Sequence, residues 1–147
     1  LYRANKLVQP DAMIADGTKI DLTLVKTPCY IQAGKEDHIA PADSVWQMMN
    51  HFKGPKRFVL AGSGHIAGVV NPPEAGKYQY WINENNPASL AEFVSGASET
   101  PGSWWPDWIE WLHRQDSTKV PAKGKRVPGA RGDKVLEDAP GRYVKTR

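Results

Sequence analysis

The sequence predicts an α/β fold, and the evidence lies in its central part. Two short apolar segments, residues 28–33 and 57–61, are rich in residues that favour β-strands, and a glycine follows each of them. Residues 41–52, which lie between them, have the apolar spacing of a helix that packs on a sheet. A strand, a helix and a second strand in this order form the unit from which parallel sheets are built. We therefore expect parallel strands with flanking helices.

The segment before this unit predicts two smaller features. Residues 1–8 are typical of a helix end, and Pro10 stops the helix because the residue before a proline is pushed out of the helical region. Asp16 and Gly17 stand between two short apolar runs. This pair favours the positive φ angles of a type I′ turn, so we expect a tight hairpin there.

The helix expected at residues 41–52 begins at a proline, which suits a first helical turn, and ends before Gly54 and Pro55. Its apolar side chains recur at i, i+3, i+4 and i+7, which places them on one face. We expect this face to pack on the sheet, and its members are Val45, Met48, Met49 and Phe52.

A short second helix is marked by a capping box, in which Ser89 is followed three residues later by Glu92. Leu90, Phe93 and Val94 supply its apolar side before Gly96 ends it.

A third helix is expected after Ser103, which is a suitable cap. Its apolar residues follow helical spacing and are Trp104, Trp105, Trp108, Trp111 and Leu112. We expect these tryptophans to belong to the core, and a partner surface is the alternative.

The chain changes character at residue 116. Residues 120–129 are broken by prolines and glycines and have no period. Segment 116–147 carries nine Lys or Arg and four Asp or Glu, so its net charge is +5 while that of the whole chain is +3. We therefore divide the chain into a folded part, residues 1–115, and an irregular basic tail, residues 116–147. Tyr143 is the tail's single aromatic residue, so we expect a solvated or docked tail and no nucleic-acid partner.

Composition excludes several function classes. The single cysteine, Cys29, permits neither an internal disulfide framework nor a multi-cysteine metal site. No apolar run reaches the about 18 residues of a membrane span, and no secretory signal pattern is visible. We expect a soluble, intracellular protein. The chain begins with Leu1 and shows no start signal, so we expect it to be a fragment of a longer protein.

Polar side chains follow both strands of the predicted parallel unit. Asp37 comes after the first strand, and His65 lies in the glycine-rich loop after the second. Ligands bind beyond the carboxyl ends of parallel strands, so we expect these side chains to meet there. An acid followed by a histidine also matches the last two members of the α/β-hydrolase triad. We predict that His65 accepts a proton as a neutral imidazole and that Asp37 orients it.

The nucleophile of such a triad has no good candidate in this chain. Neither a G-x-S-x-G nor a G-x-C-x-G motif occurs. Cys29 precedes Asp37 and lies inside a predicted strand, where we expect it to be part of the core. The glycines around Ser63 lack the Lys-Ser/Thr ending of a phosphate-binding loop, so we expect them to let the backbone turn tightly beside the sheet.

The other histidines receive weaker assignments. His38, next to Asp37, is a second imidazole at the mouth of the site or a plain loop residue, and we assign it a binding role. A metal site made of His38, His65 and Asp37 is conceivable, but no H-x-x-x-H or C-x-x-C spacing supports it, so we expect no metal. His51 and His113 lie on predicted helices and are expected at the surface.

Four segments carry a resemblance to a known family. They are GKEDHIAP at residues 34–41, GSGHIAGVVNPP at 62–73, GSWWPDW at 102–108 and APGRYVK at 139–145. Together they resemble the carboxyl part of the class I polyhydroxyalkanoate synthases, over nearly the whole chain. The resemblance implies the carboxyl-terminal portion of a catalytic domain with an α/β-hydrolase fold.

The resemblance also implies an activity. Synthases of this family move (R)-3-hydroxyacyl groups from coenzyme A onto a growing polyester through a cysteine thioester. Asp37 matches the catalytic aspartate of the family and His65 its catalytic histidine; whether Asp37 instead activates the substrate hydroxyl directly stays open. The nucleophilic cysteine of the family lies upstream, and this chain has no counterpart to it, so the chain alone is expected to be inactive.

The resemblance further implies a homodimer at the surface of cytoplasmic polyester granules, with no metal and no cofactor, because coenzyme A is a product. Two other functions stay open. An esterase or depolymerase of the α/β-hydrolase fold would use Asp37 and His65 with a serine. A non-enzymatic granule-binding module would rest on the tryptophan helix and the basic tail, and it would bind polymer without His65.

Overall fold

The computed structural model describes residues 3–121, 132, 134 and 136–146, which fall into two compact units, Leu1–Gln115 and Asp116–Arg147. All strands and α-helices of the described residues belong to the first unit, and the second contains a 3₁₀ turn at Tyr143–Lys145. The irregular stretch predicted at 120–129 lies mostly outside the described residues. None of the described helices has both the length and the apolar character needed to cross a membrane.

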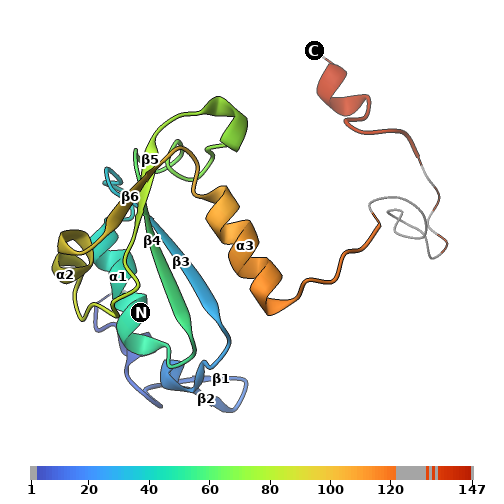
Figure 1. Ribbon diagram of the computed structural model, residues 1–147. Coiled ribbons are helices and arrows are strands. Elements are labelled where there is room, and N and C mark those ends of the chain that lie inside the picture. The colour runs from blue at the N-terminus through green and yellow to red at the C-terminus, as the bar shows by residue number, and fades with distance from the viewer. Residues whose placement is uncertain (1–2, 122–131, 133, 135, 147) are drawn as a thin grey trace. The chain divides into compact units, whose positions relative to one another are not determined.

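A four-stranded sheet in the order β3-β4-β5-β6 forms the centre of the first unit (Figure 1). Its strands are β3 (Cys29–Gly34), β4 (Lys56–Ala61), β5 (Gln79–Ile82) and β6 (Ser98–Pro101). β3 and β4 are parallel and are joined by α1 (Ala42–His51), so the predicted strand-helix-strand unit is confirmed. β5 pairs antiparallel with both β4 and β6, so the expected parallel pairing holds for β3 and β4, and the rest of this sheet is antiparallel. The fold is α/β with a mixed sheet.

Strands β5 and β6 of this sheet were not predicted because their sequence signals are weak. β5 is four residues long, and β6 is a short edge strand of exposed residues that ends in a proline. Proline is tolerated at a sheet edge because one side of such a strand needs no backbone donor. β6 is therefore defined by its backbone pairing with β5, which local composition does not reveal.

The amino-terminal region contains the predicted hairpin. β1 (Met13–Ala15) and β2 (Thr18–Ile20) are antiparallel, and Ala15 lies opposite Thr18. The two turn residues, Asp16 and Gly17, have φ angles of 45° and 74°, as the type I′ turn requires.

The helix end expected at residues 1–8 is reduced, in the described part, to a 3₁₀ turn at Lys6–Val8. Asn5, which precedes it, has a left-handed φ of 39°, a conformation that interrupts a right-handed helix. Two further 3₁₀ turns of the first unit lie at Leu22–Leu24 and Pro73–Ala75.

Helices cover both faces of the sheet (Figure 1). α1 and α2 (Leu90–Ser95) lie on one face, over a buried cluster of Ile31, Ala33, Trp46, Phe58, Leu60 and Phe93. α3 (Trp105–Gln115) lies on the other face, where the buried residues are Val59, Ala61, Tyr80 and Trp104. Successive residues of β4 thus enter different clusters, which explains why this strand is apolar without alternation.

α1 has the predicted period but a different buried face. Trp46, which is 4% exposed, is its fully buried residue, and its ring centroid lies 4.8 Å from that of Phe58. The partly buried residues beside it are Ala42, Val45 and Met49, whereas Met48 is 39% exposed. The face expected from Val45, Met48, Met49 and Phe52 is therefore shifted, because the large indole of Trp46 determines which side packs on the sheet.

The predicted helix caps are both present. Ser89 Oγ accepts the N–H of Glu92 at 3.2 Å, and the Glu92 carboxylate accepts the N–H of Ala88 at 2.9 Å. Ser103 Oγ accepts the N–H of Trp105 at 3.1 Å. Within α2, Phe93 is buried as expected, but the expectation for Val94 is wrong because its side chain is 52% exposed.

Candidate active site

Asp37 lies in the loop that follows β3, and its carboxylate is held by the backbone of that loop. Its Oδ1 accepts the N–H groups of Ile39 and Ala40, both at 2.9 Å. The side chain is 6% exposed. The hydrogen bond from Ala40, together with those from His65 and Ile39, lowers the pKa of Asp37 against the opposing effect of burial. Asp37 is therefore a fixed, ionised carboxylate at neutral pH.

His65 lies in the loop that follows β4, and the structure brings it against Asp37. Its Nδ1 is 2.8 Å from Asp37 Oδ2. The imidazole is 46% exposed. Because Nδ1 faces the carboxylate, Nε2 is the ring nitrogen that is left to exchange a proton with a substrate. This is the arrangement of a histidine base with an orienting acid.

The two loops are joined to each other by their backbones. The N–H of Lys35 donates to Ala61 O at 2.8 Å, and the N–H of Glu36 donates to Ser63 O at 3.2 Å. Ser63 has a φ of 80°, in the left-handed region that residues other than glycine rarely occupy. Such strained positions cluster at functional sites, where the surrounding structure holds them.

Close backbone approaches explain two glycines of this site. A Cβ on Gly34 would lie 3.0 Å from Asp37 Cβ, and one on Gly62 would lie 2.9 Å from Gln79 O. Both distances are too short for a relaxed contact. The glycines therefore allow the loops to turn tightly beside the sheet, as predicted for the loop of His65.

The cysteine and the other three histidines considered from the sequence have different environments. Cys29 is half-buried at the start of β3 and packs against the buried cluster on the α1 side of the sheet, so its expected place in the core is confirmed at the edge of that cluster. The loop with Asp37 follows the opposite end of this strand. Cys29 Sγ donates to Thr27 O at 3.2 Å. His38 is exposed, and its binding role stays a prediction. His113 is exposed, whereas His51 is half-buried rather than at the surface.

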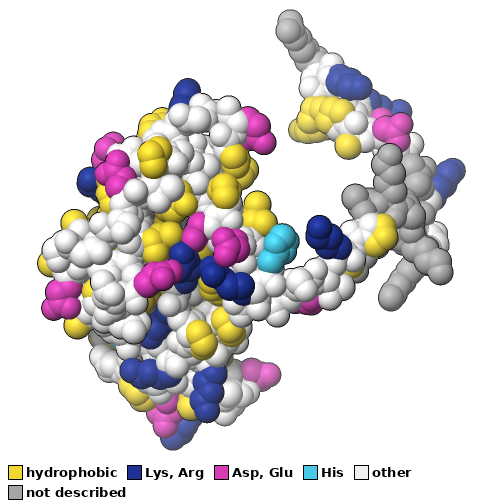
Figure 2. Space-filling model, in the orientation of Figure 1, with side chains coloured by type: hydrophobic (Ala, Val, Ile, Leu, Met, Phe, Trp, Pro, Cys, Tyr) yellow, Lys and Arg dark blue, Asp and Glu magenta, His cyan; other side chains and the backbone are white. Residues whose placement is uncertain are grey.

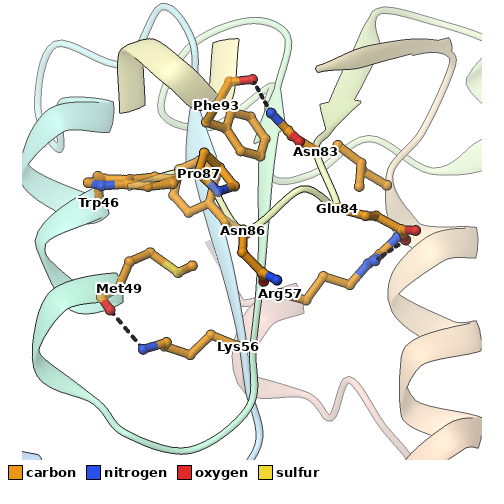
Figure 3. A pocket seen from close by; sticks show the side chains of 11 residues that line it. Trp46, Met49, Lys56, Arg57, Asn83, Glu84, Asn86, Pro87 and Phe93 are labelled. Atoms are coloured by element: carbon orange, nitrogen blue, oxygen red, sulfur yellow. Dashed lines mark hydrogen bonds and ion pairs between the residues drawn. The ribbon is translucent and has the colours of Figure 1, made fainter. Parts of the chain in front are cut away.

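A pocket of about 220 Å³ lies at the other end of the sheet (Figure 3). Its cationic side chains already have partners: Lys56 Nζ donates to Met49 O at 2.8 Å, and Arg57 pairs with Glu84 at 2.9 Å. Neither Asp37 nor His65 lines this pocket. In the described part of the chain, no group of three His, Cys, Asp or Glu residues is arranged to hold a metal ion.

A hydrogen-bonded network that the sequence did not predict attaches α3 to the sheet. Arg57 donates to both carboxylate oxygens of Asp107, at 2.9 and 2.6 Å, and Tyr30 OH donates to Asp107 Oδ2 at 2.8 Å. Burial raises the pKa of Asp107, but the hydrogen bonds from Arg57 and Tyr30 outweigh it and hold this pKa below its usual value. Burial also raises the pKa of Tyr30 well above its usual value. Figure 2 shows acidic and basic side chains side by side on this face.

The tryptophans of the α3 region have different environments. Trp104 is 8% exposed and belongs to the core, as expected, but Trp108 is 37% exposed. The indole N–H of Trp104 donates to Gly68 O at 2.8 Å, and that of half-buried Trp105 donates to Val69 O at 3.0 Å. Both acceptors belong to the segment that follows His65.

No protein-family model matches the chain. Curated proteins do match it: the chain is 47% identical over 146 residues to "Poly(3-hydroxyalkanoate) polymerase subunit PhaC" of Rhizobium etli. It is 45% identical over 146 residues to the protein of that name from Rhizobium meliloti and 40% identical over 149 residues to that from Cupriavidus necator. The resemblance to polyhydroxyalkanoate synthases is confirmed. Each alignment covers 99% of this chain but only 22% to 24% of the relative, so the chain spans about a quarter of the polymerases that it matches.

Proposed function

We propose that this chain is the carboxyl-terminal part of the catalytic domain of a class I polyhydroxyalkanoate synthase with an α/β-hydrolase fold, and that Asp37 and His65 are its catalytic acid and base. The observation that carries the proposal is the 2.8 Å contact of His65 Nδ1 with Asp37 Oδ2. This contact lies beyond the carboxyl ends of two parallel strands, where α/β proteins bind their ligands. The names of the relatives favour a polymerase over an esterase or depolymerase.

In the first half-reaction, His65 Nε2 takes the proton of a cysteine thiol supplied by the upstream part of the synthase. The thiolate attacks the thioester carbonyl of (R)-3-hydroxyacyl-coenzyme A, and the coenzyme A sulfur leaves with the proton that His65 returns. The product is an acyl group bound to the cysteine as a thioester. Coenzyme A is released and is not a resident cofactor.

In the second half-reaction, His65 takes the proton of a 3-hydroxyl group, whose oxygen attacks the acyl thioester. The new ester bond forms as the cysteine sulfur leaves, and the proton of His65 returns to that sulfur. Asp37 orients the imidazole and stabilises its cationic form.

The surroundings of Asp37 favour this orienting role over direct activation of the hydroxyl. Both carboxylate oxygens are engaged, Oδ1 by two backbone N–H groups and Oδ2 by His65. The side chain is nearly inaccessible, and its lowered pKa makes it a weak base. We therefore assign the proton transfers to His65.

The remaining assignments follow from the same proposal. The substrates are an (R)-3-hydroxyacyl-coenzyme A and the polyester chain, and the whole synthase works as a homodimer on cytoplasmic polyester granules. Residues 116–147 form a basic tail that is separate from the catalytic part, residues 1–115. His38 contributes to binding at the mouth of the site. This chain has no nucleophile of its own and is inactive without the upstream part.

The test is coenzyme A release from (R)-3-hydroxybutyryl-coenzyme A by the whole synthase that contains this chain. His65→Ala is expected to lower kcat by about 10²- to 10⁴-fold, the usual contribution of a general base. His113→Ala is the matched control, because this exposed histidine on α3 lies outside the proposed site. Circular dichroism checks that the variants are folded. Near-normal release by His65→Ala would refute the catalytic assignment.

A further inference from the structure

The loop that carries His65 has little hydrophobic support of its own. Ile66, next to the histidine, is 73% exposed, and Val70 is 62% exposed. Within the described chain, packing of these side chains therefore does little to fix the loop. Hydrogen bonds to its backbone must hold the imidazole against Asp37.

Two of these bonds come from outside the loop, from consecutive tryptophans. Trp104 Nε1 donates to Gly68 O at 2.8 Å, in a buried hydrogen bond, and Trp105 Nε1 donates to Val69 O at 3.0 Å. Residues 68 and 69 lie three and four positions after His65. The tryptophans thus hold two neighbouring carbonyl groups of the same segment.

Gly68, which accepts the hydrogen bond from Trp104, is itself bonded to the backbone beside His65. The N–H of Gly68 donates to Gly64 O at 2.9 Å, and Gly64 is the residue before the histidine. A Cβ on Gly68 would lie 2.8 Å from Gly64 O, so the two backbone segments are in close contact. Displacement of Gly68 therefore displaces the peptide unit that leads into His65.

The tryptophans are themselves held in place. Ser103 Oγ caps the start of α3 through the N–H of Trp105 at 3.1 Å. The ring of Trp104 stacks on that of Tyr30, with centroids 5.9 Å apart. Asp107, in the first turn of α3, is joined to Arg57 of β4 by two hydrogen bonds. The helix start is therefore a fixed support to which the loop is attached.

We propose that Trp104 and Trp105 are positioning residues: their indole N–H groups hold the segment after His65 so that its imidazole stays in register with Asp37 and the substrate. The inference rests on the proposed catalytic role of His65. A catalytic group must lie close to its productive geometry, and a displacement of about 1 Å costs on the order of 10²-fold in rate. Loss of one supporting hydrogen bond is expected to lower kcat by about 3- to 10-fold.

The experiment compares Trp104→Phe and Trp105→Phe in the whole synthase, because phenylalanine keeps an aromatic ring and removes the N–H donor. Trp46→Phe is the matched control. Trp46 is 4% exposed, and its Nε1 has no hydrogen-bond partner among the described residues. It lies on the other face of the sheet, where it lines the pocket of Figure 3 together with Phe93. This control loses the same ring volume in a buried place without losing a hydrogen bond.

Both test variants are expected to lower kcat for coenzyme A release about 3- to 10-fold at unchanged KM, whereas Trp46→Phe keeps the wild-type kcat in its folded fraction. The inference is overturned if kcat of the test variants falls no further than that of Trp46→Phe, or if KM changes in place of kcat. Should Trp104→Phe fail to fold, Trp105→Phe decides by the same criterion, because Trp105 is only half-buried.

His65→Ala, measured beside these variants, separates the two ideas. Retained activity in His65→Ala would refute the catalytic role of His65 and the positioning role with it. Lost activity in His65→Ala together with unchanged kcat in both tryptophan variants would refute the positioning role alone.

Discussion

Replacing Asp107 by alanine should loosen α3 far more than replacing Glu84, although both carboxylates pair with Arg57. Asp107 accepts two hydrogen bonds from Arg57 and one from Tyr30, and the charged side chains are 17% exposed for Arg57 and 11% for Asp107. Glu84 accepts one hydrogen bond from Arg57, and its side chain is 76% exposed. The same guanidinium therefore provides an internal comparison of a nearly buried pair and an exposed one.

The magnitudes follow from what each change leaves behind. Breaking a buried ion pair by removing one partner costs about 3–5 kcal/mol, because the other charge stays buried without compensation. Arg57 is not fully buried and keeps its ion pair with Glu84. We therefore expect Asp107→Ala to lower the free energy of opening α3 by about 2–4 kcal/mol, which includes the loss of the hydrogen bond from Tyr30. Glu84→Ala is expected to cost about 0–1 kcal/mol, as exposed pairs do.

Amide hydrogen exchange of the α3 peptides is the assay, because it reports local opening within a large protein. A loss of about 2–4 kcal/mol makes exchange on the order of 30- to 1,000-fold faster in Asp107→Ala, since about 1.4 kcal/mol corresponds to a factor of ten. Peptides from β1 and β2 serve as the internal reference. Exchange in α3 that is no faster for Asp107→Ala than for Glu84→Ala would refute the reasoning.

Two further predictions concern pH and the loop glycines. Burial raises the pKa of Asp107, but its hydrogen bonds outweigh this effect and lower the pKa below its usual value. The stability that Asp107 gives α3 is therefore complete above about pH 4 and is lost as the pH falls through the folded-state pKa. The protection of α3 amides, corrected for intrinsic exchange rates, should fall with acid in the wild type and much less in Asp107→Ala. Gly62→Ala should lower the free energy of unfolding by about 1–3 kcal/mol, because the new Cβ would lie 2.9 Å from Gln79 O. Gly64→Ala should lower it less, because its Cβ would lie 3.6 Å from Glu36 O. Equal thermal unfolding midpoints for the two variants would contradict this prediction.

The parallel unit and its site could be predicted because their determinants are local. Strand β3, helix α1 and strand β4 each have an apolar pattern of their own, with proline or glycine near the boundaries. Parallel pairing then brings the ends of β3 and β4 to one edge of the sheet, so the meeting of Asp37 and His65 follows from topology.

The features that were missed depend on partners far away in the sequence. β6 has no apolar pattern and exists through its pairing with β5. The buried face of α1 depends on the packing of Trp46 against Phe58 and Phe93, which periodicity alone does not reveal. Arg57 and Asp107 are 50 residues apart, and nothing in either local sequence indicates that they pair.

These distant contacts connect the stability of α3 to the geometry of the site. The Asp37 and His65 loops are joined to each other by backbone hydrogen bonds, and the His65 loop is joined to α3 by the indole groups of Trp104 and Trp105. The start of α3 is in turn held on the sheet by Asp107. If the tryptophans position His65, a variant that detaches the start of α3 must release both indole contacts together. Asp107→Ala should therefore lower kcat at least as much as either tryptophan variant, whereas Glu84→Ala should leave it unchanged.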